Sequence, residues 1–583
     1  MSRNRTRRYV ARKNGMFRPK RLGAFVSFEA LEDRTMLSAV TVDNDLDIVN
    51  GTTTSIAALI ASDGGDGISL REAIIAANND GGADTIDFDA SLAGGTITLG
   101  GTQLTITDDL TITGLGADQL TIDANNASRI FTVDDGTGAD IDVEITGLTL
   151  TGGNGSGDHG GAIANTENLT VANSTIFGNS ANSAGGSGGG IGNDGTLIVI
   201  NSTISGNSAD FGGGGIGNDG ALTVTNSTIS GNSAYAGGGI GNDSYGTLTL
   251  ANTTISGNSA DYAGGIANNG IVTVVNSTIS GNSADSGGGG IGNYGTLTVA
   301  NSTITSNSAY SGGGGIFNTV GMTTTVANSL ISGNSVVFGG REVSNAGTFN
   351  ADANNLFGHS GMTNAQAFYS FTSGVNDITA TSDGTDPTAL GSILNPTLAN
   401  NGGPTLTHAL VVGSPAINAG DNANLPADVL DLDGDLNVAE ALPVDQRGLP
   451  FVRAFGGTVD IGAYEVQPRT LVVDTLVDES DGDFSTGDLS LREAIEWANA
   501  NAGADTITFD AGLSGGTITL GGTELAITDA VTINGLGADQ LTIDADGLSR
   551  IFNVDDDTGT EIDVEIVALT LTGGNAGAED VGG

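Results

Sequence analysis

The acidic run DLDGDLNVAE, which ends at Glu440, is the segment whose residue types and spacing best suit a chemical task. Asp431, Asp433 and Asp435 alternate and are followed by Asn437, so a side-chain oxygen recurs at every second position. Carboxylate and amide oxygens that converge in a loop are typical ligands of Ca²⁺. The run therefore predicts a calcium site on Asp431, Asp433, Asp435 and Asn437, and calcium is the one cofactor that the sequence indicates.

This run resembles the start of an EF-hand or dockerin calcium loop. In those loops a turn glycine and a terminal acid complete the site, whereas this sequence has Leu436 and Leu442 at the corresponding positions. An acidic loop that stays solvated without an ion is the alternative interpretation.

Catalytic residues for polysaccharide cleavage are not indicated by the sequence. A lyase of the pectate type needs a cationic base, usually Arg or Lys, and neither occurs between Arg129 and Arg341. A glycosidase needs two acids that converge on one bond, but the acids of the repeats vary in type as exposed turn positions do. His159, His359 and His408 lack the spacing of a zinc site or a triad. The sequence therefore predicts no catalytic residues and no enzymatic activity.

The charge of the chain excludes one class of partner. The formal net charge is −49, with 67 Asp and Glu against 18 Lys and Arg, and the bases are concentrated in the first 21 residues. Nucleic-acid binding requires a basic face that releases counterions, so no nucleic-acid partner is expected. Cysteine is absent, which excludes disulfides and thiol chemistry.

The elements that must position any site are repeats of about 25 residues between 151 and 345. Their marker isoleucines are Ile191, Ile216, Ile240, Ile266, Ile291 and Ile316. Each unit has alternating β-branched and apolar residues between glycine-rich corners, which favours strands. One unit cannot bury its apolar face alone, so copies must stack about 4.8 Å apart. This predicts an all-β, right-handed parallel β-helix with short helical caps.

The stacking predicts which side chains form columns. One interior column is Leu197, Leu222, Leu248 and Leu297, and a second is Val199, Val224 and Val299. The Asn of each N-S/T-T-I motif is expected to form a hydrogen-bonded ladder, at Asn201, Asn226, Asn252, Asn276 and Asn301. Glycosylation of the same asparagines is the alternative.

The repeats resemble those of polymorphic outer membrane proteins. GGAI (Gly160 to Ile163) and sets such as ISGN (Ile204 to Asn207) are similar to the GGAI and FxxN motifs of that family, with Ile in place of Phe. The resemblance implies a right-handed parallel β-helix that is displayed on a cell surface, often as an adhesin.

Two flanking motifs also resemble known elements. SLREAIIAAN (Ser69 to Asn78) carries a capping box at Ser69 and Glu72, which predicts a helix. It resembles the CSLREA element that precedes bacterial β-helices, and Arg71 with Glu72 is expected to be a surface ion pair. The segments 401–421 and 444–465 resemble the choice-of-anchor module, which implies a C-terminal cap or attachment region.

The chain divides into five segments, the last of which repeats an earlier one. Ser69 to Asn154 aligns without a gap on Ser490 to Asn575, and the second copy stops where the first begins its glycine repeats. The expected segments are a basic N-terminal export segment at 1–39, a cap with the first coils at 40–150, the glycine-rich repeats at 151–345, a C-terminal cap or anchor module at 346–467, and a truncated second copy of the 40–150 unit at 468–583.

An export motif completes the functional prediction. FEALEDRTMLSA (Phe28 to Ala39) resembles the LEPR-x-LL motif of exported planctomycete proteins, with departures at Asp33 and Met36, and a basic disordered arm is the alternative. The sequence contains no run of 18 apolar residues, so it predicts no transmembrane helix. We therefore expect an extracellular or outer-membrane-associated adhesive or structural envelope protein with a glycan or cell-surface partner. The alternative is a carbohydrate-active protein of the polysaccharide lyase or hydrolase type.

Overall fold

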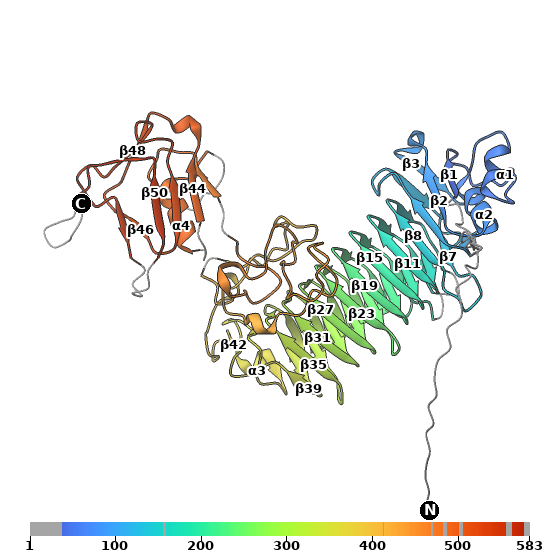
Figure 1. The fold of residues 1–583 in the computed structure, drawn as a ribbon. Coiled ribbons are helices and arrows are strands. Elements are labelled where there is room, and N and C mark those ends of the chain that lie inside the picture. The colour runs from blue at the N-terminus through green and yellow to red at the C-terminus, as the bar shows by residue number, and fades with distance from the viewer. Residues whose placement is uncertain are drawn as a thin grey trace, which may run out of the picture.

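The alternating segments form parallel strands that stack into a long β-helix (Figure 1). The computed structural model describes residues 38–155, 159–182, 185–411, 413–467, 470–481, 487–500, 505–555 and 562–575. The predicted parallel β-helix is thus confirmed. Most of the export motif lies outside the described residues, because these begin at Ser38.

Four parallel sheets, which we call A to D, form the walls of the β-helix. Sheet A has twelve strands: β1 (Ser38–Val42), β2 (Asp84–Phe88), β5 (Leu110–Thr113), β8 (Asp142–Thr146), β11 (Asn168–Ala172), β15 (Thr196–Ile200), β19 (Ala221–Thr225), β23 (Thr247–Ala251), β27 (Ile271–Val275), β31 (Thr296–Ala300), β35 (Thr323–Ala327) and β39 (Thr348–Asn350). Sheet B also has twelve: β3 (Gly95–Thr98), β6 (Leu120–Asp123), β9 (Thr149–Thr151), β12 (Thr175–Phe177), β16 (Thr203–Ser205), β20 (Thr228–Ser230), β24 (Thr254–Ser256), β28 (Thr278–Ser280), β32 (Thr303–Thr305), β36 (Leu330–Ile331), β40 (Leu356–Phe357) and β42 (Ile378–Thr379).

The other two sheets are made of shorter strands. Sheet C has eleven: β4 (Leu104–Ile106), β7 (Phe131–Val133), β10 (Ile163–Asn165), β14 (Ile191–Asn193), β18 (Ile216–Asn218), β22 (Ile240–Asn242), β26 (Ile266–Asn268), β30 (Ile291–Asn293), β34 (Ile316–Asn318), β38 (Val343–Asn345) and β41 (Phe368–Tyr369). Sheet D has seven: β13 (Ser180–Ala181), β17 (Ser208–Ala209), β21 (Ser233–Ala236), β25 (Ser259–Tyr262), β29 (Ser283–Ser286), β33 (Ser308–Gly313) and β37 (Ser335–Gly340). One coil passes through sheets A, B, D and C in turn, as β15, β16, β17 and β18 do.

The predicted interior columns are confirmed. Leu197 lies in register with Leu222, and Leu222 with Leu248. Both Val199 and Val224 are fully buried. Apolar side chains from all coils thus form one continuous core.

The predicted asparagine ladder is wrong in its position. The N-S/T-T-I asparagines are corner residues with left-handed backbone, such as Asn201 with φ of 49°, and of the described ones only Asn252 and Asn276 bond to each other. Asparagine tolerates this conformation better than most residues. The bonded ladders are built instead by two other buried columns. The first is Asn165, Asn193, Asn218, Asn242, Asn268, Asn293, Asn318 and Asn345. The second is Asn179, Asn207, Asn232, Asn258, Asn282, Asn307 and Asn334.

Helices cover the N-terminal end of the β-helix. They are α1 (Ile56–Ala61) and α2 (Leu70–Asp80), and the predicted capping box of α2 is present at Ser69 and Glu72. The expected Arg71–Glu72 pair is wrong. Arg71 pairs with Asp47 at 2.6 Å, whereas the buried Glu72 accepts backbone hydrogen bonds from Asn50 and Gly51. Both side chains therefore tie the cap together.

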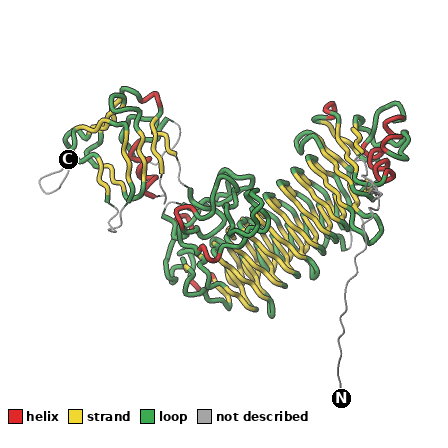
Figure 2. The backbone as a smooth tube through the Cα atoms, viewed as in Figure 1, coloured by secondary structure: helices red, strands yellow, loops and turns green. Residues whose placement is uncertain are grey.

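The segment after β39 folds back along sheet B as irregular loops (Figures 1 and 2). It contains α3 (Asn364–Ala367) and the short 3₁₀ turns Leu390–Ser392, Asn422–Asn424 and Phe455–Gly457. Gln446 donates to Thr254 at 2.9 Å and accepts from Thr278 at 2.5 Å. These threonines, which face outward on β24 and β28, are fully buried by the segment.

A second, shorter β-helix begins at residue 470 and has its own apolar core. Its helix is α4 (Leu491–Ala500), and its strands are β43 (Thr470–Val473), β44 (Asp505–Phe509), β45 (Gly516–Thr519), β46 (Leu525–Ile527), β47 (Val531–Asn534), β48 (Leu541–Asp544), β49 (Phe552–Val554), β50 (Val564–Val567) and β51 (Thr570–Thr572). Arg492 pairs with Asp478, as Arg71 does with Asp47. No helix among the described residues is long and apolar enough to cross a membrane.

Candidate functional site

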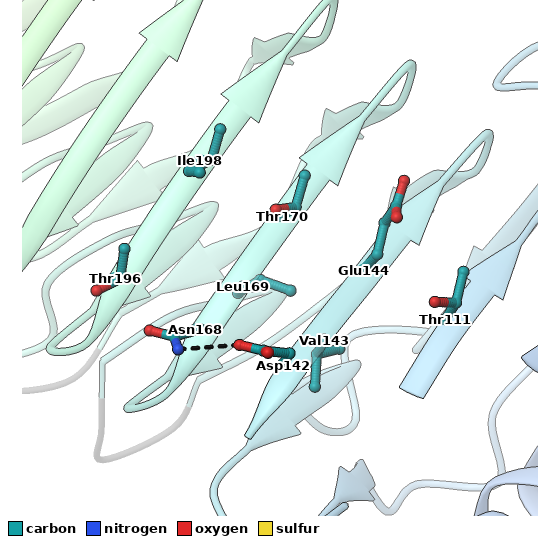
Figure 3. Close-up of a pocket in the computed structure, with 9 residues that line it drawn as sticks. All are labelled: Thr111, Asp142, Val143, Glu144, Asn168, Leu169, Thr170, Thr196 and Ile198. Atoms are coloured by element: carbon teal, nitrogen blue, oxygen red, sulfur yellow. Dashed lines mark hydrogen bonds between the residues drawn. The ribbon is translucent and has the colours of Figure 1, made fainter. Parts of the chain in front are cut away.

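A groove on the outer face of sheet A is the candidate site (Figure 3). Its volume is about 510 Å³ and it crosses β5, β8, β11 and β15. It is lined by Thr111, Asp142, Val143, Glu144, Asn168, Leu169, Thr170, Thr196 and Ile198.

The strand register arranges the groove side chains in two rows along the axis of the β-helix. Asp142 lies beside Asn168, which lies beside Thr196. In the other row Glu144 lies between Thr111 and Thr170. Because strands run across the axis, an extended polymer that follows the axis would have one row on each side.

Asp142 and Glu144 are the two groups in this groove that can transfer protons. Both are exposed, and because they are two residues apart on β8 they point to the same face, with their Cα atoms about 6.6 Å apart along the strand. Asn168 Nδ2 donates to Asp142 Oδ1 at 3.0 Å. Two carboxyl groups that lie on either side of a glycosidic bond can hydrolyse it by general acid and base catalysis.

Sequence reasoning missed this pair because β8 lies before the glycine repeats. The signal was present, since two acids stand at the outward positions of β8 where neighbouring strands have Thr or Asn. No Lys, Arg or His is among the residues that line this groove.

The acids that follow the sheet C asparagines lie together on another edge of the β-helix. They are Asp194, Asp219 and Asp243, and Asp219 is partly buried. Burial, with the negative charges of Asp243 and Asp194, raises the pKa of Asp219. Among described residues these three do not form a cluster tight enough to hold one metal ion.

Aromatic rings form an exposed column beside sheet D. The rings of Phe211 and Tyr235 stack with centroids 6.2 Å apart, and Tyr235 meets Tyr262 edge-on at 5.0 Å. Two coils further on, Tyr310 meets Phe338 at 5.4 Å. Serines and acids line a shallow groove beside the column, with a volume of about 330 Å³.

The structure brings together three of the four residues predicted to bind calcium. Oxygens of Asp431, Asp433 and Asp435 lie within 4.8 Å of one another. Asn437 instead donates its side-chain amide to Glu440 Oε2 at 3.1 Å. The structure also places Asp428 and Glu440 beside Asp433, and the sequence pattern included neither as a ligand.

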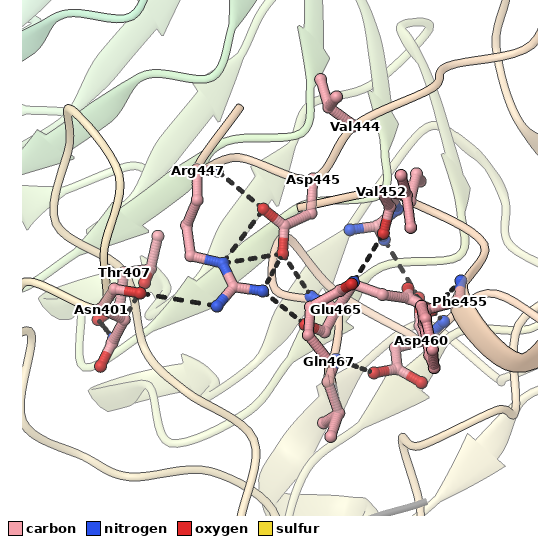
Figure 4. Close-up of polar contacts among 12 residues, drawn as sticks. Asn401, Thr407, Val444, Asp445, Arg447, Val452, Phe455, Asp460, Glu465 and Gln467 are labelled. Atoms are coloured by element: carbon pink, nitrogen blue, oxygen red, sulfur yellow. Dashed lines mark hydrogen bonds and ion pairs between the residues drawn. The ribbon is translucent and has the colours of Figure 1, made fainter. Parts of the chain in front are cut away.

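A buried ionic network holds the irregular segment in shape (Figure 4). Arg447 pairs with Asp445 at 2.6 Å and lies between the rings of Phe451 and Tyr464. Glu465 accepts hydrogen bonds from the backbone N–H groups of Phe455 and Asp460. This network is buried, so it stabilises the fold and is not accessible to a substrate.

We expect this network to make stability fall as pH rises. Burial, with the charge of Asp460, raises the pKa of Glu465 to about 9. The folded protein therefore holds this proton more tightly than the unfolded chain does. The contribution of the proton to the free energy of unfolding is fully present below about pH 4.3, the pKa of Glu in the unfolded chain, and is lost as pH rises through about 9. The melting temperature of the wild type should fall as pH is raised from 5 to 9. In Glu465→Gln it should fall less steeply.

The exposed Asp386 of the same segment provides the control. Asp386→Asn should keep the pH dependence of the wild type. An equal slope in Glu465→Gln and in the wild type would contradict the assignment.

His408, one of the three histidines, also has a structural role. It is buried, and its ring lies 2.8 Å from Ser280 Oγ and 2.8 Å from the carbonyl oxygen of Asn395. Burial lowers its pKa. His408 therefore fastens the irregular segment to β28.

Comparisons with known proteins found similar solved structures but no matching family. No protein family matches the chain, and no curated protein matches it. The pectate lyase Pel9A is similar over 74% of this chain and 97% of its own, with 16% identity and a TM-score of 0.41. The PL6 family alginate lyase AlyGC is similar over 92% of this chain and 71% of its own, with 11% identity and a TM-score of 0.28.

These comparisons change two of the predictions. The prediction that the chain is not an enzyme is contradicted, because the similar solved structures are polysaccharide lyases. The predicted resemblance to polymorphic outer membrane proteins is not supported, because no protein family matches the chain.

Proposed function

We propose that the protein binds an extended polysaccharide in the groove on sheet A and hydrolyses its glycosidic bonds. The observation that carries the proposal is the placement of Asp142 and Glu144 on one face of β8, in a groove whose rows follow the β-helix axis. A chain lying between the rows would have one carboxyl group on each side of a glycosidic bond.

In this proposal the two carboxyl groups have different tasks. Glu144 donates a proton to the glycosidic oxygen as the bond from this oxygen to the anomeric carbon breaks. Asp142, oriented by Asn168, takes a proton from the water that attacks the anomeric carbon. One product gains the hydroxyl group and the other the proton. Because the water attacks directly, on the face opposite the leaving oxygen, the hydrolysis inverts the anomeric configuration.

The charge of the groove indicates the class of substrate. Among the described residues, only Asp142 and Glu144 of the lining are ionisable, and they would repel the carboxylates of a uronic acid polymer. Elimination from such a polymer also needs a base and a cation beside the sugar carboxylate, and no basic residue lines the groove. A neutral polysaccharide is therefore the proposed substrate.

A panel of neutral and acidic polysaccharides tests the proposal. We expect new reducing ends from a neutral polymer without the ultraviolet absorbance of unsaturated sugars. Unsaturated products from an acidic polymer would overturn hydrolysis in favour of elimination. If no polymer yields new reducing ends, both hydrolysis and elimination are overturned.

A second proposed role is adhesion to a glycan-covered surface through the aromatic column. The observation that favours it is the exposure of the rings, which lie at the spacing of successive coils with acids and hydroxyl groups beside them. Aromatic faces pack against apolar faces of sugars, while the polar groups accept or donate hydrogen bonds.

Tyr235→Ala should weaken glycan binding about fivefold, because it removes the central ring of the column, and the loss of about 40 Å² of apolar contact with a sugar costs about 1 kcal/mol. Affinity electrophoresis in gels that contain each polysaccharide measures the change. Tyr245, a loop tyrosine that is 90% exposed, provides the control, and Tyr245→Ala should bind like the wild type. Equal binding by both variants and the wild type would refute the role of the column.

We also propose that the chain works outside the cell or at the outer membrane. The strong negative charge supports this location, as does the resemblance of the segment Phe28 to Ala39 to an export motif. Fractionation of the native organism's envelope would test it.

A further inference from the structure

We propose that the loop 428–440 binds one Ca²⁺, with Asp428, Asp433 and Glu440 as the central ligands. The structure places one oxygen from each of these residues within 4.8 Å of the others. Ligands 2.3–2.6 Å from one calcium ion lie at most about 5 Å apart. The three carboxylates are therefore close enough to share one ion.

The loop is closed at its base, so the ligands are held by the fold. Ala427 and Ala441 form an antiparallel bridge, and the backbone N–H of Asp428 donates to the carbonyl oxygen of Glu440 at 2.9 Å. Within the loop, Asp431, Gly434 and Leu436 have left-handed backbone. These turns bring the acids toward one another.

Two buried carboxylate oxygens in this cluster lack a hydrogen-bond donor. Asp428 is 1% exposed, and its Oδ2 accepts from Leu432 N at 2.8 Å, but its Oδ1 has no partner. Oε1 of Glu440 is also buried without a partner. A buried carboxylate oxygen without a donor is costly, and a cation would satisfy both oxygens.

Asp431 and Asp435 differ from Asp428 and Glu440, because neither is among the described residues with a buried oxygen that lacks a partner. Oδ1 of Asp431 accepts from Leu436 N at 2.9 Å, and Oδ1 of Asp435 accepts from Asn437 N at 2.7 Å. These oxygens already shape the loop, so the two acids add negative charge beside the ion. The proposed ligand set therefore differs from the alternating set that the sequence predicts.

Calorimetric titration of the full chain with CaCl₂, in about 0.15 M salt to screen the other surface acids, tests the site. We expect one saturable calcium site and a melting temperature that rises with calcium and falls on chelation. Asp428→Asn and Glu440→Gln should each lower the calcium affinity at least tenfold. Asp386→Asn, on an exposed acid of the same segment, should bind like the wild type.

Several outcomes would overturn the proposal. They are the absence of a saturable site, equal calcium affinity in Glu440→Gln and the wild type, and tighter binding of Mg²⁺ than of Ca²⁺. Circular dichroism shows whether each variant keeps its β structure. Because Glu440 lies at the partly exposed side of the loop, Glu440→Gln decides the result if Asp428→Asn does not fold. Polysaccharide cleavage is a separate measurement, so either proposal can fail alone.

Discussion

Asp142→Asn and Glu144→Gln should each lower the rate of polysaccharide hydrolysis about 10²–10⁴-fold, the usual contribution of a general acid or base. Neither amide can donate or take the proton that the reaction moves. Both side chains are exposed, so the melting temperature should stay close to that of the wild type. Initial rates of reducing-end formation measure the effect.

Asp87→Asn provides a matched control for these variants. Asp87 is an exposed acid on β2 of the same sheet, but it is not among the residues that line the groove. Its replacement should leave the rate unchanged. Equal rates for all three variants and the wild type would remove the carboxylate pair from the mechanism, even if the protein cleaves polysaccharide elsewhere.

The second large effect is expected on stability, from Asn232→Leu. Asn232 is 1% exposed, accepts hydrogen bonds from Asn207 N and Nδ2, and donates to Ile204 O and Asn258 Oδ1. Leucine keeps the approximate volume but makes none of these bonds. The four hydrogen bonds of the Asn232 side chain are lost, and each contributes about 0.5–1.5 kcal/mol.

We therefore expect Asn232→Leu to lower the free energy of unfolding by about 2–6 kcal/mol. Urea denaturation followed by circular dichroism measures this change. Asn269→Ala, at an exposed asparagine of a neighbouring coil, should change stability by less than about 0.5 kcal/mol. A loss below 1 kcal/mol in Asn232→Leu would show that the ladder contributes little.

The ladder also explains how the coils stay in register. Each amide donates to the next coil at 2.8–3.0 Å in the sheet C column, so a coil shifted by one residue would lose its bond and bury an unpaired amide. The column beside sheet D ends on Glu342, which accepts from Asn334 Nδ2 at 2.6 Å. Burial raises the pKa of Glu342 to about 8.

Local patterns in the sequence were sufficient to predict the parallel β-helix, the interior columns and the capping box of α2. Alternation, the repeat period and the S-x-x-E spacing depend on residues that are close in the chain or one coil apart, and such patterns determine which face is buried. The asparagine ladders show the limit of this reasoning. Each repeat contains at least three asparagines, and only the backbone at each position determines which of them face inward.

The tertiary structure alone decided where chemistry can occur. Asp142 and Glu144 share a face because they are two residues apart on β8, but only the stacking of coils placed Asn168 and Thr170 beside them. Asp428 joined the acidic loop because a bridge closes that loop at its base. Arg71 met Asp47 rather than its neighbour Glu72 because consecutive helical residues point in different directions. Sequence patterns therefore determined the scaffold, whereas contacts between distant residues determined the candidate sites.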